Sequence, residues 1–208
     1  MSLGKIQKES SMIGTEGERK LQEEFGSQER ATRFYDRQMH DHLTEGMQSF
    51  IHRQEMMFIA TADAKGHCDC SPRFGQPGFV VVLNEKTIAY PEFRGNGIFA
   101  SMGNIIENPH IGLVFVDFLD STVGLHVNGQ AQLFQVDQIP ASLALVAQRH
   151  STAHTHSLIE RWILVKIEEA YIHCSKHVPR LQKLNKSISW GTDSPKAKVD
   201  DFFCQSKS

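Results

Sequence analysis

Hydrophobic positions in the first quarter of the chain recur at helical spacing. Thr15-Glu16-Gly17-Glu18 matches the S/T-x-x-E capping box, which predicts a helix that begins there and stops at Gly26. From Gln28 to Arg53 apolar residues return every three or four positions, which predicts one helical face with a break near residues 36–41. We therefore expect residues 1–14 to be a flexible N-terminus and residues 15–54 to form a helical arm.

The pattern changes at Met56 into short β-rich runs that are separated by Gly, Pro, Asn and Asp. Six such runs cover residues 56–63, 78–83, 87–90, 111–118, 123–134 and 162–173, with short helices expected at 97–106 and 138–148. Strands that follow one another through such short connections do not fit βαβ repetition. The sequence predicts a mainly β protein with some α: a six-stranded antiparallel barrel within a domain at 15–185, followed by a polar tail at 186–208.

Charge and composition narrow the function classes. Lys plus Arg number 22 and Asp plus Glu number 24, so a formal net charge of -2 gives no field that favours nucleic acid. No run of 18 apolar residues is present and the N-terminus lacks a signal pattern, so we expect no membrane partner and a cytoplasmic protein. The four cysteines fit reduced thiols, and the Cys68/Cys70 spacing is shorter than a zinc pair normally uses.

Two glycine-containing connections carry arginines. Arg94-Gly95-Asn96-Gly97 precedes an expected helix whose unpaired N–H groups, together with Arg94 and Ser101, outline a phosphate pocket. The segment 71–80 holds Arg73 in a connection fixed by two prolines and two glycines. Each could also be an ordinary surface connection with an exposed arginine. A barrel would bring both to one mouth, and two arginines there would suit a dianionic phosphate.

Histidines and nucleophiles give weaker signals. His150, His154 and His156 have an i, i+4 spacing seen in metal sites but no acidic or cysteine neighbour, so we predict no metal there. His126 lies within an expected strand and could face a pocket or a partner. No G-x-S-x-G elbow and no convincing acid/base couple appear, so no catalytic residue is assigned.

Four ordered blocks of this sequence resemble the pyridoxamine 5′-phosphate oxidase-like flavoproteins, a family of FMN-binding split barrels. The blocks are FIATADAKGHCDCSPRFGQPGFVVVL, TIAYPEFRGNGIFASMGNIIENPHIGLVFVDF, GLHVNGQAQL and EEAYIHCSKHVPRL, and the resemblance covers about residues 15–185. It looks most like a poorly characterised branch of the family. The resemblance implies a six-stranded split barrel that forms a homodimer, with FMN bound in clefts between the subunits.

The resemblance also assigns cofactor-binding residues. Ser71 and Arg73 would approach the flavin, and the backbone from Gly78 through Val80 and Val81 would face its ring. The residues expected around the phosphate are Tyr90, Pro91, Arg94, Asn96, Ser101 and Asn104. His173 and Lys176 would reach across from the other subunit. The family's Arg/Lys run after the third strand is replaced here by RGNGIFASMGN, and its C-terminal substrate-binding arginine block has no counterpart, which weighs against vitamin B6 as substrate.

The resulting hypothesis is an FMN-dependent oxidoreductase that acts on a small molecule of unknown identity, with NAD(P)H as a candidate electron donor. The flavin would supply the redox chemistry, so no protein acid or base is required. The alternative is a non-catalytic module that binds or senses flavin or haem, for which His126 and His173 are the candidate residues.

Overall fold

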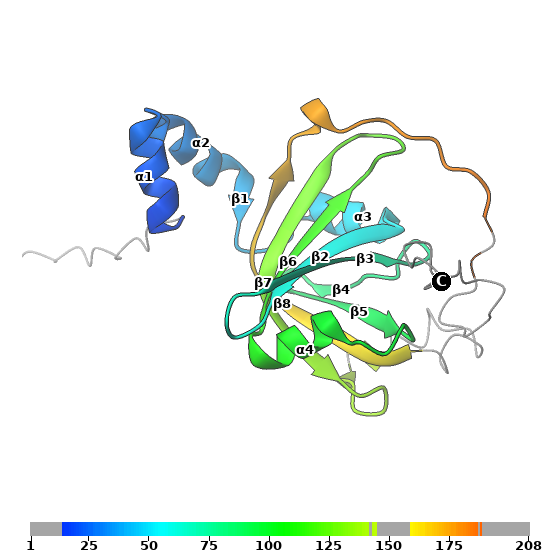
Figure 1. Cartoon of the computed structure of the whole chain (residues 1–208). Helices are drawn as coiled ribbons and strands as arrows, with labels where there is room; N and C mark the ends of the chain where they lie inside the picture. The colour runs from blue at the N-terminus through cyan, green and yellow to red at the C-terminus, as the bar shows by residue number, and fades with distance from the viewer. Residues whose placement is uncertain (1–13, 142, 145–158, 187, 189–208) are drawn as a thin grey trace, which may run out of the picture. The chain divides into compact units, whose positions relative to one another are not determined.

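The computed structural model describes residues 14–141, 143–144, 159–186 and 188, and its internal contacts divide the chain into two compact units, Met1–Met39 and His40–Ser208 (Figure 1). The first unit holds α1 (Glu16–Glu24) and α2 (Gln28–Gln38). The Thr15 hydroxyl accepts from the Glu18 N–H at 3.1 Å, and the Glu18 carboxylate accepts from the Thr15 N–H at 3.1 Å. The predicted capping box is therefore confirmed.

The predicted helical face beyond Gln28 is interrupted, as expected, after α2. A two-residue strand, β1 (Met39–His40), lies at the boundary of the two units, and α3 (Glu45–Arg53) follows in the second unit. The Thr44 hydroxyl caps α3 by accepting from the Met47 N–H at 3.3 Å. Phe50 and Ile51 of α3 are buried in the main core. This part of the predicted arm thus packs with the β-sheet.

The second unit is built around an antiparallel sheet whose pairing order is β3-β2-β6-β7-β8-β5-β4. Its strands are β2 (Met56–Ala62), β3 (Cys68–Phe74), β4 (Val81–Asn84), β5 (Thr87–Phe93), β6 (His110–Val116), β7 (Gly124–Phe134) and β8 (Ile159–His173). The helix α4 (Ala100–Glu107) and the 3-10 turn η1 (Ser175–His177) complete the described elements. The predicted mainly β antiparallel fold with short inserted helices is confirmed.

Two strands, the two-residue β1 and the longer β3, were not expected from the sequence. Residues 71–74, which we expected in a connection, belong to β3, and the adjoining connection to β4 is residues 75–80. Pro72 lies in β3, which stands at one end of the pairing path. Proline is tolerated there because an edge strand need not donate every backbone N–H to a neighbour.

Alternating buried residues build the core inside the curved sheet. Met57, Ile59 and Thr61 of β2 are buried while their strand neighbours are more exposed, and β6 repeats the pattern at Leu113 and Phe115. At Gly129 a β-bulge lets β7 approach β8 closely, since an added Cβ would lie 2.1 Å from the Lys166 carbonyl oxygen. The largest fully buried side chain is Trp162, in a smaller cluster beside Val81 and Ala89.

Several sequence expectations fall at the limits of the described chain. The helix expected at 138–148 has helical residues only from 141 among those described, so Asp137 is not its N-cap. His150, His154 and His156 lie outside the described residues, as does nearly all of the tail expected at 186–208. Before that tail the chain runs along the β6–β7 connection, where the Leu181 N–H donates to the Phe118 carbonyl at 2.7 Å.

The β6–β7 connection is organised by one carboxylate. Asp117 accepts from the backbone N–H groups of Leu119, Asp120 and Ser121 at 2.9–3.1 Å and from the Ser121 hydroxyl at 2.7 Å. Partial burial pushes the pKa of Asp117 upward, but these hydrogen bonds outweigh it and lower the pKa to about 2. A lowered folded-state pKa stabilises the fold above the unfolded-state pKa, and that stability is lost as the pH falls through the folded-state pKa.

We predict that Asp117→Asn lowers the free energy of unfolding by about 1 kcal/mol at neutral pH, because the amide replaces a charged acceptor of several hydrogen bonds. The difference from the wild type should shrink as the pH falls from about 4 to about 2, where the native carboxylate is protonated. Urea unfolding at a series of pH values measures this. Asp120→Asn is the matched control in the same loop, and a difference that is constant with pH would contradict the prediction.

Candidate functional site

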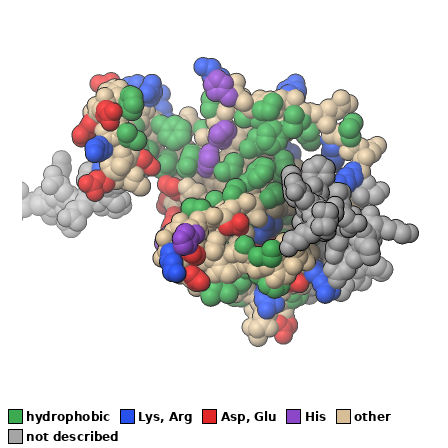
Figure 2. Space-filling view, in the orientation of Figure 1, with side chains coloured by type: hydrophobic (Ala, Val, Ile, Leu, Met, Phe, Trp, Pro, Cys, Tyr) green, Lys and Arg blue, Asp and Glu red, His purple; other side chains and the backbone are tan. Residues whose placement is uncertain are grey.

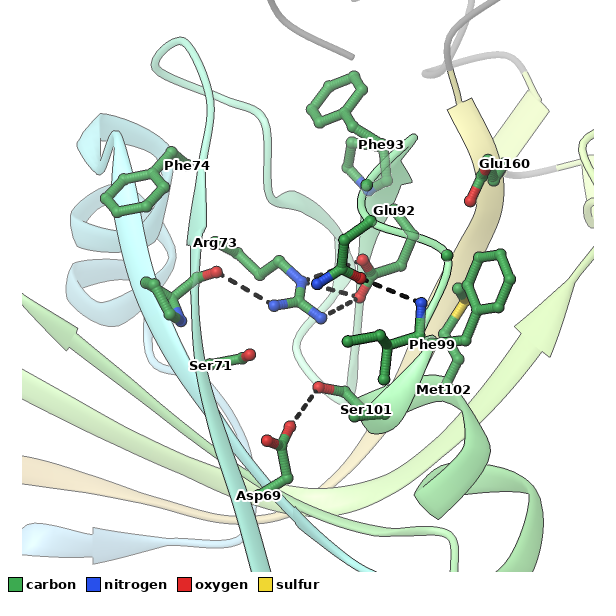
Figure 3. Close-up of a pocket in the computed structure, with 17 residues that line it drawn as sticks. Asp69, Ser71, Arg73, Phe74, Glu92, Phe93, Phe99, Ser101, Met102 and Glu160 are labelled. Atoms are coloured by element: carbon green, nitrogen blue, oxygen red, sulfur yellow. Dashed lines mark hydrogen bonds and ion pairs between the residues drawn. The ribbon is translucent and has the colours of Figure 1, made fainter. Parts of the chain in front are cut away.

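A cavity of about 640 Å³ opens where the end of β3, the end of β5 and the beginning of α4 meet (Figure 3). Glu160, at the beginning of β8, completes its wall. The lining residues are Asp69, Ser71, Pro72, Arg73, Phe74, Pro91, Glu92, Phe93, residues 95–102 and Glu160. The site therefore combines strand ends, which are fixed by the sheet, with a helix N-terminus.

β3 supplies three polar side chains to the cavity. Asp69, Ser71 and Arg73 are separated by two residues each, so they share one face of the strand, and all three line the cavity (Figure 3). Cys68 and Cys70 alternate with them and are exposed. Because side chains alternate along the strand, these three polar side chains lie on one face and the two thiols lie on the opposite face.

Arg73 forms a buried ion pair with Glu92 of β5. The Arg73 Nε donates to the two Glu92 carboxylate oxygens at 2.8 and 3.0 Å, and its Nη2 lies 2.8 Å from Oε1. The two side chains are 19% and 8% exposed, so the pair is largely removed from water. Burial raises the pKa of Glu92, while Arg73 pulls it back and the nearby Glu160 adds to the rise. Removal of either side chain would leave the other charge buried without a partner, which is unfavourable.

The ion pair lies at a part of β5 that β4 does not cover. β4 pairs with β5 only through Ala89, so Pro91 and Glu92 have a neighbour in β8 but none on the β4 side within the described chain. β3, at the opposite end of the pairing path, reaches this uncovered section of β5 through the Arg73 side chain. The two ends of the sheet are thereby joined by side chains rather than by a ladder of backbone hydrogen bonds.

The connection between β5 and α4 forms the floor of the cavity. Gly97 takes a left-handed conformation with φ +81°, and the Asn96 side chain accepts from the Ile98 N–H at 3.0 Å. The helix begins at Ala100, later than the expected Gly97, after Phe99 with φ 55°. The N-cap residue Phe99 makes no side-chain capping hydrogen bond, so the first N–H groups present the positive end of the helix to the cavity.

A carboxylate stands beside this helix terminus. The Ser101 hydroxyl donates to the Asp69 carboxylate at 2.8 Å, and Ser101 is 4% exposed. An acidic side chain at the first turn of a helix is favourable because it faces the unpaired N–H groups. Asp69 therefore holds, in this structure, the kind of position that an anionic ligand would take.

The structure brings together some of the predicted binding residues and separates others. Ser71, Arg73, Pro91, Asn96 and Ser101 all line the cavity. The remaining residues of the predicted set do not line it.

Arg94 is exposed just before the cavity-lining residues 95–102 and is not among the lining residues. The Asn104 amide faces β2 and donates to the Thr61 hydroxyl at 3.1 Å. Val80, Val81 and Tyr90 are buried in the core, and burial raises the pKa of Tyr90, whose hydroxyl has no hydrogen-bond partner among the described residues. The two arginines that the sequence analysis singled out therefore have different environments. Arg73 is largely buried in an ion pair with Glu92, and Arg94 is exposed at the surface.

His173 lies at the other end of β8 from Glu160. The two residues are 13 positions apart on one strand, which corresponds to roughly 40 Å. His173 Nδ1 is 3.0 Å from His126 Nε2, and His126 stacks on Tyr171. Burial lowers the pKa of His126, the nearby His173 lowers it further, and Glu169 opposes both. Lys176 is exposed in η1. Neither His173 nor Lys176 lines the cavity.

Sequence reasoning missed three acidic residues of the site. Asp69 could have been found by extending the strand period back from Arg73 and Ser71. Glu92 is recognisable only through the pairing that brings β3 to β5. Glu160 enters from β8 and carries no local signal in the sequence. Three aromatic residues, Phe74, Phe93 and Phe99, were also missed because they adjoin connections.

The described part of the chain holds neither a candidate metal-binding cluster nor a candidate membrane-spanning helix. Among these residues, no group of three His, Cys, Asp or Glu side chains is placed to hold a metal ion. No described helix is both long and apolar enough to cross a bilayer.

A family model described as pyridoxamine 5′-phosphate oxidase matches residues 43–174, well over half of the chain. A search of curated proteins gave no match. Solved structures with a similar chain path include HupZ from Group A Streptococcus, with 21% identity over 67% of this chain and 99% of that chain and a TM-score of 0.47. A putative pyridoxamine 5′-phosphate oxidase from Lactobacillus delbrueckii has 23% identity, covers 64% and 95%, and has a TM-score of 0.46. The haem storage protein HutZ from Vibrio cholerae has 15% identity, covers 62% and 94%, and has a TM-score of 0.44.

We predict that Arg73→Met destabilises the second unit by about 3 kcal/mol, because it leaves the Glu92 carboxylate buried without its partner. The double variant Arg73→Met/Glu92→Leu should recover most of this loss, since it removes both charges together. Chemical denaturation of the single and double variants measures the difference. Lys183→Met breaks the more exposed ion pair with Glu55 and should cost less than about 1 kcal/mol. Equal losses in the single and double variants would refute a coupled pair.

Proposed function

The chain belongs to the pyridoxamine 5′-phosphate oxidase family, and we propose that it is an FMN-dependent oxidoreductase for a small molecule, with the flavin held in the cavity between β3, β5 and α4. The observation that carries the proposal is the meeting, in one cavity, of an uncapped helix N-terminus with the side chains of Ser71 and Asn96. Such a donor set suits a phosphorylated cofactor.

The residues present fit the different parts of FMN in different ways. The N–H groups at the beginning of α4 would hold the phosphate, with Arg94 at the adjoining surface as its counter-charge. The hydroxyl of Ser71 would hydrogen-bond polar flavin atoms, and the apolar side chains of Ile98 and Phe99 would cover an apolar ring face. Arg73 would act differently from the sequence prediction, because its charge is already balanced by Glu92 and its part is to shape the wall.

When bound, FMN would supply transfer of a hydride or of two electrons, and the chain supplies the surroundings. The buried Arg73–Glu92 pair fixes β3 against β5, so the cavity wall cannot shift freely when a ligand enters. The sheet and α4 exclude water from one side of the bound molecule. NAD(P)H remains the proposed electron donor, and the small-molecule substrate would enter through the open side of the cavity.

We further propose a homodimer with the outer face of the sheet as the contact surface. Phe58, Val114, His126 and Tyr171 are cross-strand neighbours on four adjacent strands, and each alternates with buried core residues. They therefore form an outward row that is rich in apolar and aromatic atoms, and Figure 2 shows hydrophobic side chains gathered on this side of the molecule. Such a row favours a protein contact. A second subunit would also be needed to bring His173 and Lys176 to a cavity, as the sequence prediction requires.

The haem alternative has less support from the geometry. His126 and His173 hydrogen-bond to each other, His126 is stacked on Tyr171, and neither lines the cavity. The contact leaves His126 Nδ1 and His173 Nε2 unused, so the position of the two rings outside the cavity lining is what weighs against haem in this cavity.

We predict that the purified protein binds FMN and that Arg94→Ala weakens binding by about 1.5–3 kcal/mol, or about 10- to 150-fold, the scale of a charge-assisted contact. Flavin absorbance of the protein as purified and quenching of FMN fluorescence on titration measure this. Arg53→Ala removes an arginine that lies outside the cavity lining and is the control. Absence of FMN binding by the wild type would overturn the proposed cofactor, and unchanged binding by Arg94→Ala would remove Arg94 from the site.

A second prediction tests where the phosphate binds. Asp69→Asn keeps an acceptor for the Ser101 hydroxyl but removes the negative charge beside α4, so FMN should bind about fivefold more tightly. Riboflavin, which lacks the phosphate, should bind the variant and the wild type equally. Isothermal titration with both ligands separates these effects. The placement at α4 is wrong if Asp69→Asn changes the affinity for riboflavin as much as that for FMN.

A further inference from the structure

A second cavity, of about 620 Å³, shares Phe74 with the cavity between β3, β5 and α4. It lies where the C-terminal end of α3 meets the β6–β7 connection and the segment at 181–188 that follows η1. Its volume falls within the range of about 300–1,000 Å³ that is usual for binding pockets. The proposed flavin site and the proposed dimer surface leave this second cavity without a role.

Large apolar side chains line the second cavity and are exposed to solvent in the described part of the chain. Phe74, Leu119, Leu181 and Ile188 are each about half-exposed, although all four line the same hollow. The Leu181 N–H donates to the Phe118 carbonyl at 2.7 Å, so this wall is tied to the β6–β7 connection. Apolar side chains that gather in a concave surface, rather than lie singly, favour the binding of another apolar group.

The acidic side chains of the second cavity are largely balanced by their neighbours. Glu55 is paired with Lys183, and the Asp117 carboxylate accepts hydrogen bonds from its own loop. Arg180 donates a hydrogen bond to the backbone carbonyl of Asp120 and so lies beside the third carboxylate. These carboxylates therefore have little free negative charge to repel an anion.

Two basic side chains at the second cavity lack such a balance. Arg53 and Lys186 line it, are exposed, and form no ion pair with a described carboxylate. The Arg53 Nη1 donates only to the Ser49 carbonyl, at 3.3 Å. An apolar hollow with two unpaired cations at its rim suits an occupant that carries apolar and anionic groups next to each other.

The C-terminal end of the sequence contains a segment of this character. Residues 199–203 read Val-Asp-Asp-Phe-Phe, so two carboxylates directly precede two aromatic side chains, with no Lys or Arg among them. These residues lie outside the described part of the chain. Ile188 lines the second cavity, and Asp200 follows it by twelve positions, over which an extended chain spans roughly 40 Å. The intervening residues are therefore sufficient for the chain to return to the cavity.

We propose that the second cavity binds residues 199–203 of the same chain, with a phenyl ring of Phe202 or Phe203 against its apolar wall and the two aspartates near Arg53 and Lys186. Such binding removes apolar surface of both partners from water and pairs the unbalanced charges. Attachment to the same chain gives the segment an effective concentration on the order of millimolar, so a modest intrinsic affinity is enough to fill the cavity.

This contact goes beyond the proposed flavin-dependent function and does not rest on it. Phe74 lines both cavities, so the bound segment would pack against one wall residue of the proposed flavin site. The other residues that carry the contact are not used by the flavin proposal, so either proposal can fail without the other.

The test is calorimetric titration of full-length protein with a peptide of residues 197–206, blocked at both ends and carrying Cys204→Ser. In the wild type the attached segment should compete with the peptide, whereas full-length Phe202→Ser/Phe203→Ser should leave the cavity open. We therefore expect the peptide to bind this variant at least tenfold more tightly than the wild type. Trp190→Ser removes a nearby aromatic side chain but keeps residues 199–203, and as the matched control it should behave as the wild type.

Substitutions in the cavity test where the peptide binds. Leu119→Ser/Leu181→Ser, added to the phenylalanine variant, should weaken peptide binding at least tenfold, because both side chains line the cavity. Ile106→Ser, on the exposed side of α4 and outside this cavity, should have no effect. Lys186→Gln should weaken binding about threefold at low salt, whereas Lys65→Gln, at an exposed position elsewhere, should not.

Melting curves show that each variant is folded before it is titrated. The proposal is overturned if the peptide binds the wild type and folded Phe202→Ser/Phe203→Ser equally, because the chain's own segment would then not occupy the cavity. It is also overturned if this variant binds no peptide, or if binding survives Leu119→Ser/Leu181→Ser. Competition in the wild type that appears only as the protein concentration rises would assign the segment to a second copy of the chain and overturn the contact within one chain.

Discussion

The Arg73–Glu92 ion pair links the two ends of the sheet and forms part of the cavity wall. From β3 to β4 the strands form one continuous hydrogen-bonded path, and the ends of that path meet through side chains and the connection at 75–80. A buried pair of this kind is stringent, since each charge requires the other. β3 is therefore fixed at the distance from β5 that the two side chains set, and the space left beside them becomes the site.

The position of this ion pair also places charged groups of both signs close together around the cavity. The joint between β3 and β5 contributes a neutral pair, the beginning of α4 contributes partial positive charge, and Asp69 and Glu160 contribute negative charge on different sides. A ligand with a single charge would interact favourably with only some of these charged groups. Membership of the pyridoxamine 5′-phosphate oxidase family and a helix N-terminus that faces the cavity are consistent with the proposed binding of a phosphorylated cofactor there.

Sequence patterns correctly predicted the parts of the fold that depend on interactions between residues close together in the chain. The capping box at Thr15 and the β-rich run that begins at Met56 are short-range patterns, and both appear as predicted. Arg73 and Ser101 were singled out because arginine, glycine and hydroxyl residues cluster in two segments, and Ser71 was assigned through the family resemblance; all three line the cavity.

The parts that were missed depend on contacts between distant segments. β3 was missed because Pro72 is normally a strand breaker, and it is accommodated here by an edge position that only the pairing order reveals. The partnership of Arg73 with Glu92 depends on where β4 stops pairing, and Glu160 belongs to a strand that begins much later in the chain. Neither could be deduced from local pattern.

The short β4 has a consequence for how the protein behaves in a concentrated solution. Beyond Ala89 one side of β5 has no strand neighbour in the described chain, although Tyr90, Pro91 and Glu92 are buried. An unpaired strand edge is where a strand from another molecule can add and begin aggregation. Pro91 offers no N–H for such an addition, and the Arg73 guanidinium lies against the Glu92 side chain at the same place. Pro91 and the Arg73–Glu92 ion pair, which line the cavity, thus also hinder the addition of another chain's strand to this edge of the sheet.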